Sequence, residues 1–489
     1  MTFLRTLCTG AVLLLFSLFT TAQTPGNFSD DRQLPGGVRG ERIKALLEAI
    51  NSNDAARIEQ FMNTQTAAHF HDFAPMEEHI GTFKDTYRMT GGIDFYSIRQ
   101  YTPPRDQFVV IGRDRLFGSW YGFIMTFEGP EQKIDNLNFT PARPPQTEQE
   151  QPLSEEEMLR TLREKLDLLC RRDAFSGAVL LARGDRVLFE YACGEASKSY
   201  HANNNIDTRF NLGSMNKMFT ATAVMQLAEK GKLRLDDPIS RYVDESWLPK
   251  SITDRVTVQH LLTHTSGLGS YFNDTYVNSS RELFRELDDY KRLVQGDTLA
   301  FEPGSRFQYS NTGMLLLGVV VEKASGMNYF DYIRQNVYQP AGMTRSDCYE
   351  LDRPQDNLAE GYLQAPGGGW KNNVFMHVMR GGPAGGGYAT VHDLHRYARA
   401  MQTGKLVSDK SLEQMWQGHS EGNYGFGFEV ENGPAGLVVG HGGGFPGLNS
   451  HLDIFQDKGY ILVVMSNYDM GAEPLRNYVR GLIFNRLKD

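Results

Sequence analysis

Apolar residues recur at helical spacing in the first part of the chain and alternate at strand-like spacing after Gly91. From Arg42 to Met62 they stand three or four positions apart, which predicts helix. The runs FYSIRQY, QFVVIGRD and GSWYGFIMTFEG follow, separated by Pro and Gly turns, and predict strands of an antiparallel sheet. This part of the chain is therefore expected to form a small α+β domain.

The regular spacing of apolar residues ends between Pro141 and Pro152, where Pro, Gln and Glu predominate and apolar residues are almost absent. That composition is typical of a linker. We therefore divide the chain into a first domain at residues 23–140, a linker at 141–153 and a second domain at 154–489. Helices followed by a curved sheet make the first domain resemble the small NTF2-like domain.

One cluster in the first domain has the residue types of a metal site. Surface or packed histidines explain it better than a bound ion, so we expect no metal there. The cluster consists of His69, His71, Asp72, Glu77, Glu78 and His79.

The second domain opens with Ser154-Glu155-Glu156-Glu157, a capping box that begins a helix. This helix has one apolar face, made of Leu159, Leu162, Leu166 and Leu169. Strand-like runs occur at both ends of the domain, with helices and loops between them. The pattern predicts one mixed sheet assembled from the two ends of the domain.

Residues 1–22 have the pattern of a secretory signal peptide. Arg5 precedes an apolar run from Ala11 to Phe19, and small residues end the segment at Ala22. The run is too short to span a bilayer permanently. We expect a secreted or periplasmic protein with no integral membrane span after this segment is removed.

Composition and charge exclude some functions. The chain has 40% hydrophobic and 22% charged residues and a net charge of −9, which describes a globular protein without a nucleic-acid-binding surface. His260 and His264 have zinc-protease spacing, but Leu261 stands where that motif needs Glu. Three cysteines follow the signal segment, namely Cys170, Cys193 and Cys348. Because their number is odd, at least one thiol is expected to be free.

Two motifs near the C-terminus suggest an α/β-hydrolase, but their context excludes it. Residues 418–422 fit the G-x-S-x-G nucleophile pattern around Ser420, and His441-Gly-Gly-Gly444 fits a lipase oxyanion segment. A nucleophile elbow needs a strand before the serine and a helix after it, whereas Ser420 has the reverse. The oxyanion segment should also precede the nucleophile. Ser420 is therefore not expected to be catalytic.

Ser214 and Lys217 form the one Ser-x-x-Lys motif of the chain, at the start of an apolar helix. Spacing of three places both side chains on one helical face. A Ser cap followed by a solvent-facing Lys is the simpler alternative, but this helix offers Lys217 little solvated surface. Burial lowers the basicity of an amine, and a neutral amine can accept the serine proton.

A Tyr-x-Asn triplet accompanies Ser-x-x-Lys in penicilloyl serine enzymes. The triplet occurs three times here, at Tyr271, Tyr276 and Tyr309. The third follows the turn-rich FEPGSRFQ and precedes the apolar run TGMLLLGVVVEKASG, whose helix would fix the loop. We therefore select Tyr309 and Asn311.

Six segments in order resemble the serine β-lactamase and DD-peptidase superfamily, in the class C-like branch that includes D-aminopeptidases and esterases. They are GSMNKMFTA, LDDPISRYV, VTVQHLLTHTSGL, FEPGSRFQYSNTGMLLLGVVVEKASG, PAGGGYATVHDLHRYARAM and GHGGGFPG. The likeness covers about residues 155–489. It implies an α+β fold, with an antiparallel sheet flanked by helices and an all-helical subdomain.

The resemblance also implies residue roles. Ser214 would be the acylated nucleophile, Lys217 its proton-relay partner and Tyr309 a second general acid or base. Asn311 would hold Lys217 and the substrate amide. The strand lining the cleft would carry His441 and Gly443 as a His-x-Gly motif, and the oxyanion hole would be the N–H groups of Ser214 and Gly444. No metal or other cofactor is implied.

These roles predict an exported serine hydrolase that acts through an acyl-enzyme on amide or ester bonds. Candidate substrates are small molecules or peptides, namely D-amino-acid peptides, small esters or β-lactams. β-Lactamases of this branch carry Lys-Thr-Gly to bind a carboxylate, so His441 and Gly442 favour a peptidase or esterase. The alternative is a non-catalytic, acylatable penicillin-binding sensor or ligand-binding protein on the same fold.

Overall fold

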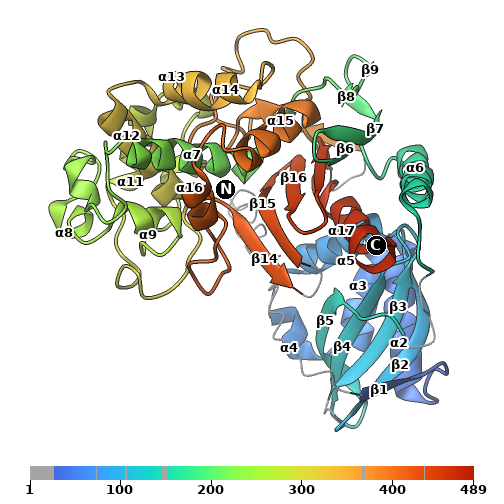
Figure 1. Ribbon diagram of the computed structural model, residues 1–489. Coiled ribbons are helices and arrows are strands. Elements are labelled where there is room, and N and C mark those ends of the chain that lie inside the picture. Colours follow the sequence, from blue (N-terminus) through green and yellow to red (C-terminus); the bar gives the residue numbers. More distant parts are fainter. Residues whose placement is uncertain are drawn as a thin grey trace. The chain divides into compact units, whose positions relative to one another are not determined.

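The computed structural model describes residues 27–72, 74–104, 107–145, 151–365, 369–433 and 436–488 (Figure 1). These residues divide into two compact units. The first contains the described residues up to Ala174 and those from Asn477 onward, and the second contains Phe175–Arg476. The expected signal peptide, residues 1–22, lies outside the described residues. Within the described ranges, no helix has the length and apolarity needed to cross a membrane.

The first unit is an antiparallel five-stranded sheet with helices packed on it, in the strand order β1-β2-β3-β4-β5. The helices bury Ile43, Leu46 and Phe61 against Val110 and Phe123 of the sheet. The expected α+β domain is thus confirmed, and its likeness to the NTF2-like domain stays a prediction. In chain order its elements are β1 (Asn27–Asp31), α2 (Val38–Ser52), α3 (Ala55–Gln65), α4 (Ala68–Asp72), α5 (Met76–Thr90), β2 (Ile93–Thr102), β3 (Phe108–Asp114), β4 (Trp120–Glu128) and β5 (Lys133–Pro141).

The helical pattern from Arg42 to Met62 forms two helices rather than one. Asn53 adopts a left-handed conformation, with φ of 49°, and its N–H bonds to the Ile50 carbonyl to end α2. Asp54 then caps α3, because its side chain accepts the N–H of Arg57. Strands β1 and β5 were not expected from the pattern.

The capping box at Ser154 and Glu157 is confirmed, and it begins α6 (Glu155–Arg171). The buried face of α6 includes Met158 in place of the expected Leu159. This helix and the residues from Asn477 onward are grouped with the first unit. The domain limits drawn from the sequence therefore stay a prediction.

The second unit contains a six-stranded sheet in the order β14-β15-β16-β17-β6-β7. It joins the two ends of the unit, as expected, and every neighbouring pair is antiparallel. This confirms the antiparallel sheet that the family resemblance implied, whereas the mixed sheet predicted from the pattern alone is wrong. Short turns reverse the chain direction between β6 and β7 and between successive strands from β14 to β17, while β17 pairs with β6 from the other end of the unit. The strands are β6 (Gly177–Arg183), β7 (Arg186–Cys193), β14 (Glu429–Gly433), β15 (Gly436–Phe445), β16 (Leu448–Phe455) and β17 (Tyr460–Ser466).

Helices of the second unit lie mainly to one side of this sheet, while α15 (Val391–Gln402) packs on β6 and β17 (Figure 1). The helical part has at its centre α7 (Asn216–Glu229) and α12 (Asn311–Ser325), which are buried over most of their length and contact each other. The remaining helices include α8 (Lys250–Thr253), α9 (Val258–Leu262), α10 (Asp274–Val277), α11 (Lys291–Val294), α13 (Tyr329–Ile333), α14 (Gln339–Ala341), α16 (Asp409–Met415) and α17 (Glu473–Gly481), the last extending into the first unit.

Candidate active site

Ser214 lies in a single 3-10 turn, Gly213–Met215, immediately before α7. Gly213 has a φ of 49°, and its N–H bonds to Oδ1 of Asn211 at 2.9 Å. A Cβ on Gly213 would lie 3.0 Å from the main-chain nitrogen of Gly444. The serine turn is therefore pressed against β15, the strand expected to line the cleft.

Lys217 is fully buried, with 0% of its surface exposed. Its Nζ lies 2.9 Å from Oγ of Ser214, 3.0 Å from Oδ1 of Asn311 and 2.6 Å from the Ala384 carbonyl oxygen. Burial lowers the pKa of Lys217 well below its ordinary value, and the carboxylate of Glu429 only partly opposes this effect.

The partners of Lys217 determine which way its lone pair points. Oδ1 of Asn311 and the Ala384 carbonyl can only accept hydrogen bonds, so they take the two hydrogens of a neutral amine. In the neutral form the lone pair then remains for the Ser214 hydroxyl, whereas the protonated form donates its third hydrogen to the Ser214 oxygen. The arrangement can accept a proton from the serine as its oxygen attacks an acyl group.

Tyr309 and Asn311 flank Ser310, the residue that caps α12. The Tyr309 ring lies 4.8 Å from Nζ of Lys217, and 38% of the residue is exposed. Loss of hydration raises the pKa of Tyr309, while its hydrogen bond with Ser214 acts in the opposite direction, so the phenol stays protonated. Asn311 donates from Nδ2 to the Ser270 hydroxyl at 3.2 Å, which turns its Oδ1 toward Lys217.

The other two Tyr-x-Asn triplets have structural roles. Tyr271 is buried and packs against Phe272 and Tyr290. Asn273 caps α10 by accepting the N–H of Tyr276. The third triplet is thus the one that the fold brings to Lys217, as selected from its context.

His264 was considered in the sequence only as a false zinc ligand, but it packs behind the Tyr309 loop. It is fully buried, and its ring lies 4.4 Å from the Tyr309 ring. Nδ1 accepts the N–H of Ser310 at 3.1 Å, and the His264 carbonyl accepts the N–H of Gln308 at 2.8 Å. Burial lowers the pKa of His264 well below its ordinary value, so the ring is neutral. The signal in the sequence that could have identified His264 is its place in LLTHTSGL, part of one of the six segments that carry the family resemblance.

On β15, Gly443 lies directly against the serine turn. A Cβ there would lie 1.9 Å from the Leu212 carbonyl oxygen and 3.2 Å from the Ser214 nitrogen, so only glycine fits. Gly444, the next residue, has open space on its Cβ side. The register of β14 with β15 ends at Gly440, which leaves the β15 edge from His441 onward without a partner among the described strands on that side.

His441 is almost fully buried, with 2% of its surface exposed. Nε2 lies 2.8 Å from the Tyr424 hydroxyl, and Nδ1 lies 2.6 Å from the Gly442 carbonyl. Because a carbonyl only accepts, Nδ1 carries the hydrogen and Nε2 accepts from Tyr424. Both ring nitrogens are therefore engaged, and direct contact of the imidazole with substrate stays a prediction.

Ser420 lies in the turn between α16 and β14. Its hydroxyl is buried and has no hydrogen-bond partner within the described chain. The neighbouring His419 instead stacks on Phe426 and contacts the Gln414 carbonyl. The helix-before, strand-after context read from the sequence is present.

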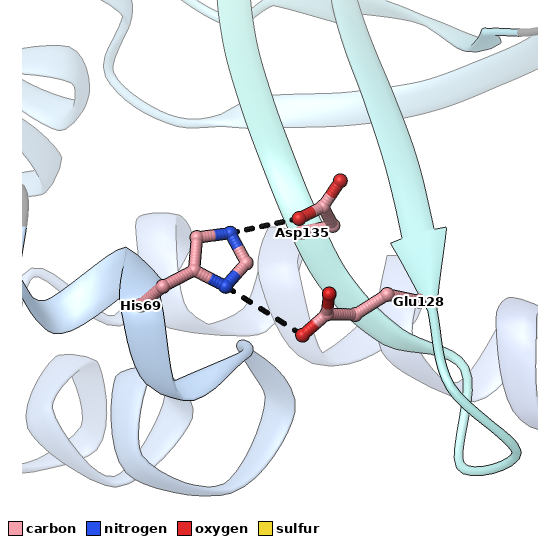
Figure 2. Close-up of side chains that lie close together, drawn as sticks. All are labelled: His69, Glu128 and Asp135. Atoms are coloured by element: carbon pink, nitrogen blue, oxygen red, sulfur yellow. Dashed lines mark ion pairs between the residues drawn. The ribbon is translucent and has the colours of Figure 1, made fainter.

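In the first unit, His69 of α4 lies between two carboxylates at the ends of β4 and β5 (Figure 2). Nδ1 is 3.6 Å from Glu128, and Nε2 is 2.8 Å from Asp135. These contacts join α4 to the hairpin of β4 and β5, and one ligand atom from each of the three side chains lies within 4.8 Å of the others. The expected absence of a metal stays a prediction. His79 packs on Phe70, and the side chains of His71 and Asp72 lie outside the described residues.

Comparisons with known proteins agree on one family. A family model described as Beta-lactamase matches residues 157–483. Penicillin-binding protein 4* of Bacillus subtilis (strain 168) is 31% identical over 326 residues, covering 63% of this chain and 71% of that protein. Esterase EstB of Burkholderia gladioli is 34% identical over 208 residues, covering 40% of this chain and 52% of the esterase. The crystal structure of a penicillin-binding protein from Bacillus halodurans aligns with a TM-score of 0.61 at 32% identity, covering 66% of this chain and 98% of that one.

Proposed function

The chain belongs to the β-lactamase family of serine hydrolases, and from that premise we propose that it cleaves amide or ester bonds through an acyl-enzyme on Ser214. One observation carries the proposal. The buried Nζ of Lys217 lies 2.9 Å from Oγ of Ser214, with its other hydrogen-bonding positions occupied by acceptors.

In the first step, Oγ of Ser214 attacks the carbonyl carbon while Nζ of Lys217 takes the hydroxyl proton. The raised pKa of Tyr309 keeps its phenol protonated, which favours Lys217 as the base of this step. The N–H groups of Ser214 and Gly444 would bind the oxyanion. The close approach of Gly213 to Gly444 supports this pairing.

In the second step, Tyr309 donates its proton to the leaving oxygen or nitrogen as the bond to the carbonyl carbon breaks. The protonated Lys217 then returns a proton to Tyr309, and the acyl group remains on Ser214. Water attacks the acyl-enzyme with the same two groups moving its protons, and the acid and the free serine are released.

The His-x-Gly motif at residues 441–443 favours peptides or esters over β-lactams as substrates. Gly442 has no hydroxyl to hold a carboxylate, and His441 has no fixed positive charge because burial lowers its pKa below the ordinary value. We further propose that the protein is exported, to the periplasm or the medium. The leader-like pattern at residues 1–22 supports this proposal.

Turnover tests the proposal against the alternative of a non-catalytic sensor. The protein and its Ser214→Ala variant would be incubated with a p-nitrophenyl ester, a D-alanyl amide and a reporter penicillin. Product release by the wild type that is lost in Ser214→Ala supports the hydrolase. A lasting adduct without product release would instead identify a sensor.

A further inference from the structure

Glu429 places a carboxylate at the start of the unpaired edge of β15. It is the first residue of β14, and half of its side chain is exposed. Its Oε1 accepts the N–H of Gly442 at 3.3 Å and lies 3.7 Å from Nδ1 of His441. Burial raises the pKa of this carboxyl, but the charge of nearby Arg476 and the hydrogen bond from the Gly442 N–H act in the opposite direction, and the pKa lies below its ordinary value.

Among the described residues, no cationic side chain forms a hydrogen-bonded ion pair with Glu429. His441, its one ion-pair contact within the described residues, uses its Nδ1 hydrogen on the Gly442 carbonyl and is neutral. His451, on the adjacent strand β16, is buried, and burial lowers its pKa to about 3. Arg476 is charged, but two hydrogen bonds of 2.8 Å each hold it to Asp453.

Gly442 stands where β-lactamases of this branch carry the Thr of Lys-Thr-Gly, so no hydroxyl is present there to bind a carboxylate. A Cβ on Gly442 would lie 2.8 Å from Cε1 of His451 and 3.7 Å from Oε1 of Glu429. The His451 ring therefore takes the space of the missing side chain. The formally charged atom among those nearest to a Cβ on Gly442 is Oε1 of Glu429. Its carboxylate repels an anion and attracts a cation.

The position of Glu429 relative to Ser214 determines which half of a substrate it meets. When the carbonyl oxygen of a substrate is bound at Gly444, the two halves of the substrate extend in opposite directions along β15. One half points toward Phe445 and the other toward His441. Glu429 lies toward His441, and the His441 ring lies 6.5 Å from the ring of Tyr309. In the proposed mechanism Tyr309 protonates the leaving group, so the leaving group points toward Glu429.

We propose that Glu429 forms a cation-selective leaving-group subsite, so that preferred substrates carry an ammonium group on the alcohol or amine that departs. The inference rests on the proposed function, since it takes Ser214 as nucleophile and Tyr309 as the proton donor. Two residues along a strand span about 7 Å, so the distance from Gly444 to Gly442 sets the reach of the ammonium from the scissile carbonyl. Substrates with a carboxylate at that place are disfavoured.

A pair of esters with matched shape tests the subsite. Acetylcholine and 3,3-dimethylbutyl acetate differ in the positive charge of the leaving alcohol and share the acyl group. Their ratio of kcat/KM, divided by the ratio of their alkaline hydrolysis rates, is expected to be about tenfold or more in favour of acetylcholine. The excess should diminish as salt is added.

The variants Glu429→Gln and Glu431→Gln identify the source of the preference. Glu429→Gln is expected to bring the corrected ratio close to one, whatever happens to the separate rates, because a change in Lys217 basicity affects both esters alike. Glu431→Gln, which removes a carboxylate two residues along β14, should keep the ratio. A corrected ratio near one in the wild type, or a ratio kept in Glu429→Gln, overturns the subsite. Failure of the proposed function is seen separately, as turnover of the neutral ester that survives Ser214→Ala.

Discussion

The imidazole of His264 accepts the main-chain N–H of Ser310 at 3.1 Å, and this bond ties the loop that carries Tyr309 to the segment that follows α9. The His264 ring also packs on the Tyr309 ring. His264 is thus a positioning residue for the Tyr-x-Asn loop, since it reaches the reacting groups through its neighbours.

Replacing His264 should slow catalysis to an extent that depends on the replacement. His264→Ala removes the acceptor and is expected to lower kcat by roughly 10- to 100-fold, the cost of misplacing a catalytic group by about an ångström. His264→Asn should recover part of the loss, because its side-chain oxygen can accept the Ser310 N–H and Asn tolerates the φ of 57°. Steady-state kinetics on a p-nitrophenyl ester measures this, with circular dichroism to check folding. An equal loss of kcat in both variants would show that the hydrogen bond from the Ser310 N–H does not explain the effect of His264.

The contact between Gly442 and His451 predicts that their substitutions are coupled. Gly442→Thr should lower the free energy of unfolding by roughly 1–3 kcal/mol, because its side chain collides with a buried ring. Gly442→Thr combined with His451→Ala should be more stable than Gly442→Thr alone. Gly444→Ala is the matched control for stability, since its added methyl meets open space. Additive effects in a urea-unfolding double-mutant cycle would contradict the contact.

Burial of Lys217 is expected to lower the free energy of unfolding, while the lowered pKa of its amine supports catalysis. Its pKa is lower in the folded chain than in the unfolded chain, so the unfolded chain binds more protons between these two values, and stability rises with pH through that window. Lys217→Met should therefore raise Tm near pH 7, with an advantage that shrinks as pH rises. It should also lower kcat/KM by about 10³-fold or more.

Two measurements check the prediction for Lys217. Differential scanning calorimetry from pH 6 to pH 9 gives the Tm difference, and Lys230→Met, an exposed position at the end of the same helix, should leave the pH dependence as in the wild type. The wild-type rate should fall on the acidic side as Lys217 becomes protonated. A Tm advantage of Lys217→Met that grows with pH would contradict the sign of this effect.

The parts of the site that were predicted from the sequence are those whose spacing is local. Ser214 and Lys217 are one helical turn apart, and Tyr309 and Asn311 flank the cap of a single helix, so short motifs identify them. The expectation of at least one free thiol also holds, since Cys348 is buried and free. The roles of these residues in catalysis stay predictions.

The groups that were missed depend on strand register and on the main chain. Glu429 approaches β15 because it pairs with Gly440 from β14, and His451 meets Gly442 because they are partners in the pairing of β16 with β15. Ala384 contributes a carbonyl oxygen, which no side-chain pattern can reveal. The strand pattern alone predicted a mixed sheet for a similar reason, because the direction of a strand is set by its partners and its connections rather than by its own residues. The antiparallel arrangement was implied only by the family resemblance.

The central claim is that Ser214 carries the acyl group. Intact mass spectrometry after rapid acid quenching of the protein with p-nitrophenyl acetate should find one acetyl group, and peptide mapping should place it on the segment that contains Ser214. Ser420→Ala should form the same adduct, and Ser214→Ala should form none. An acetyl group that persists in Ser214→Ala, or that disappears in Ser420→Ala, would contradict the account.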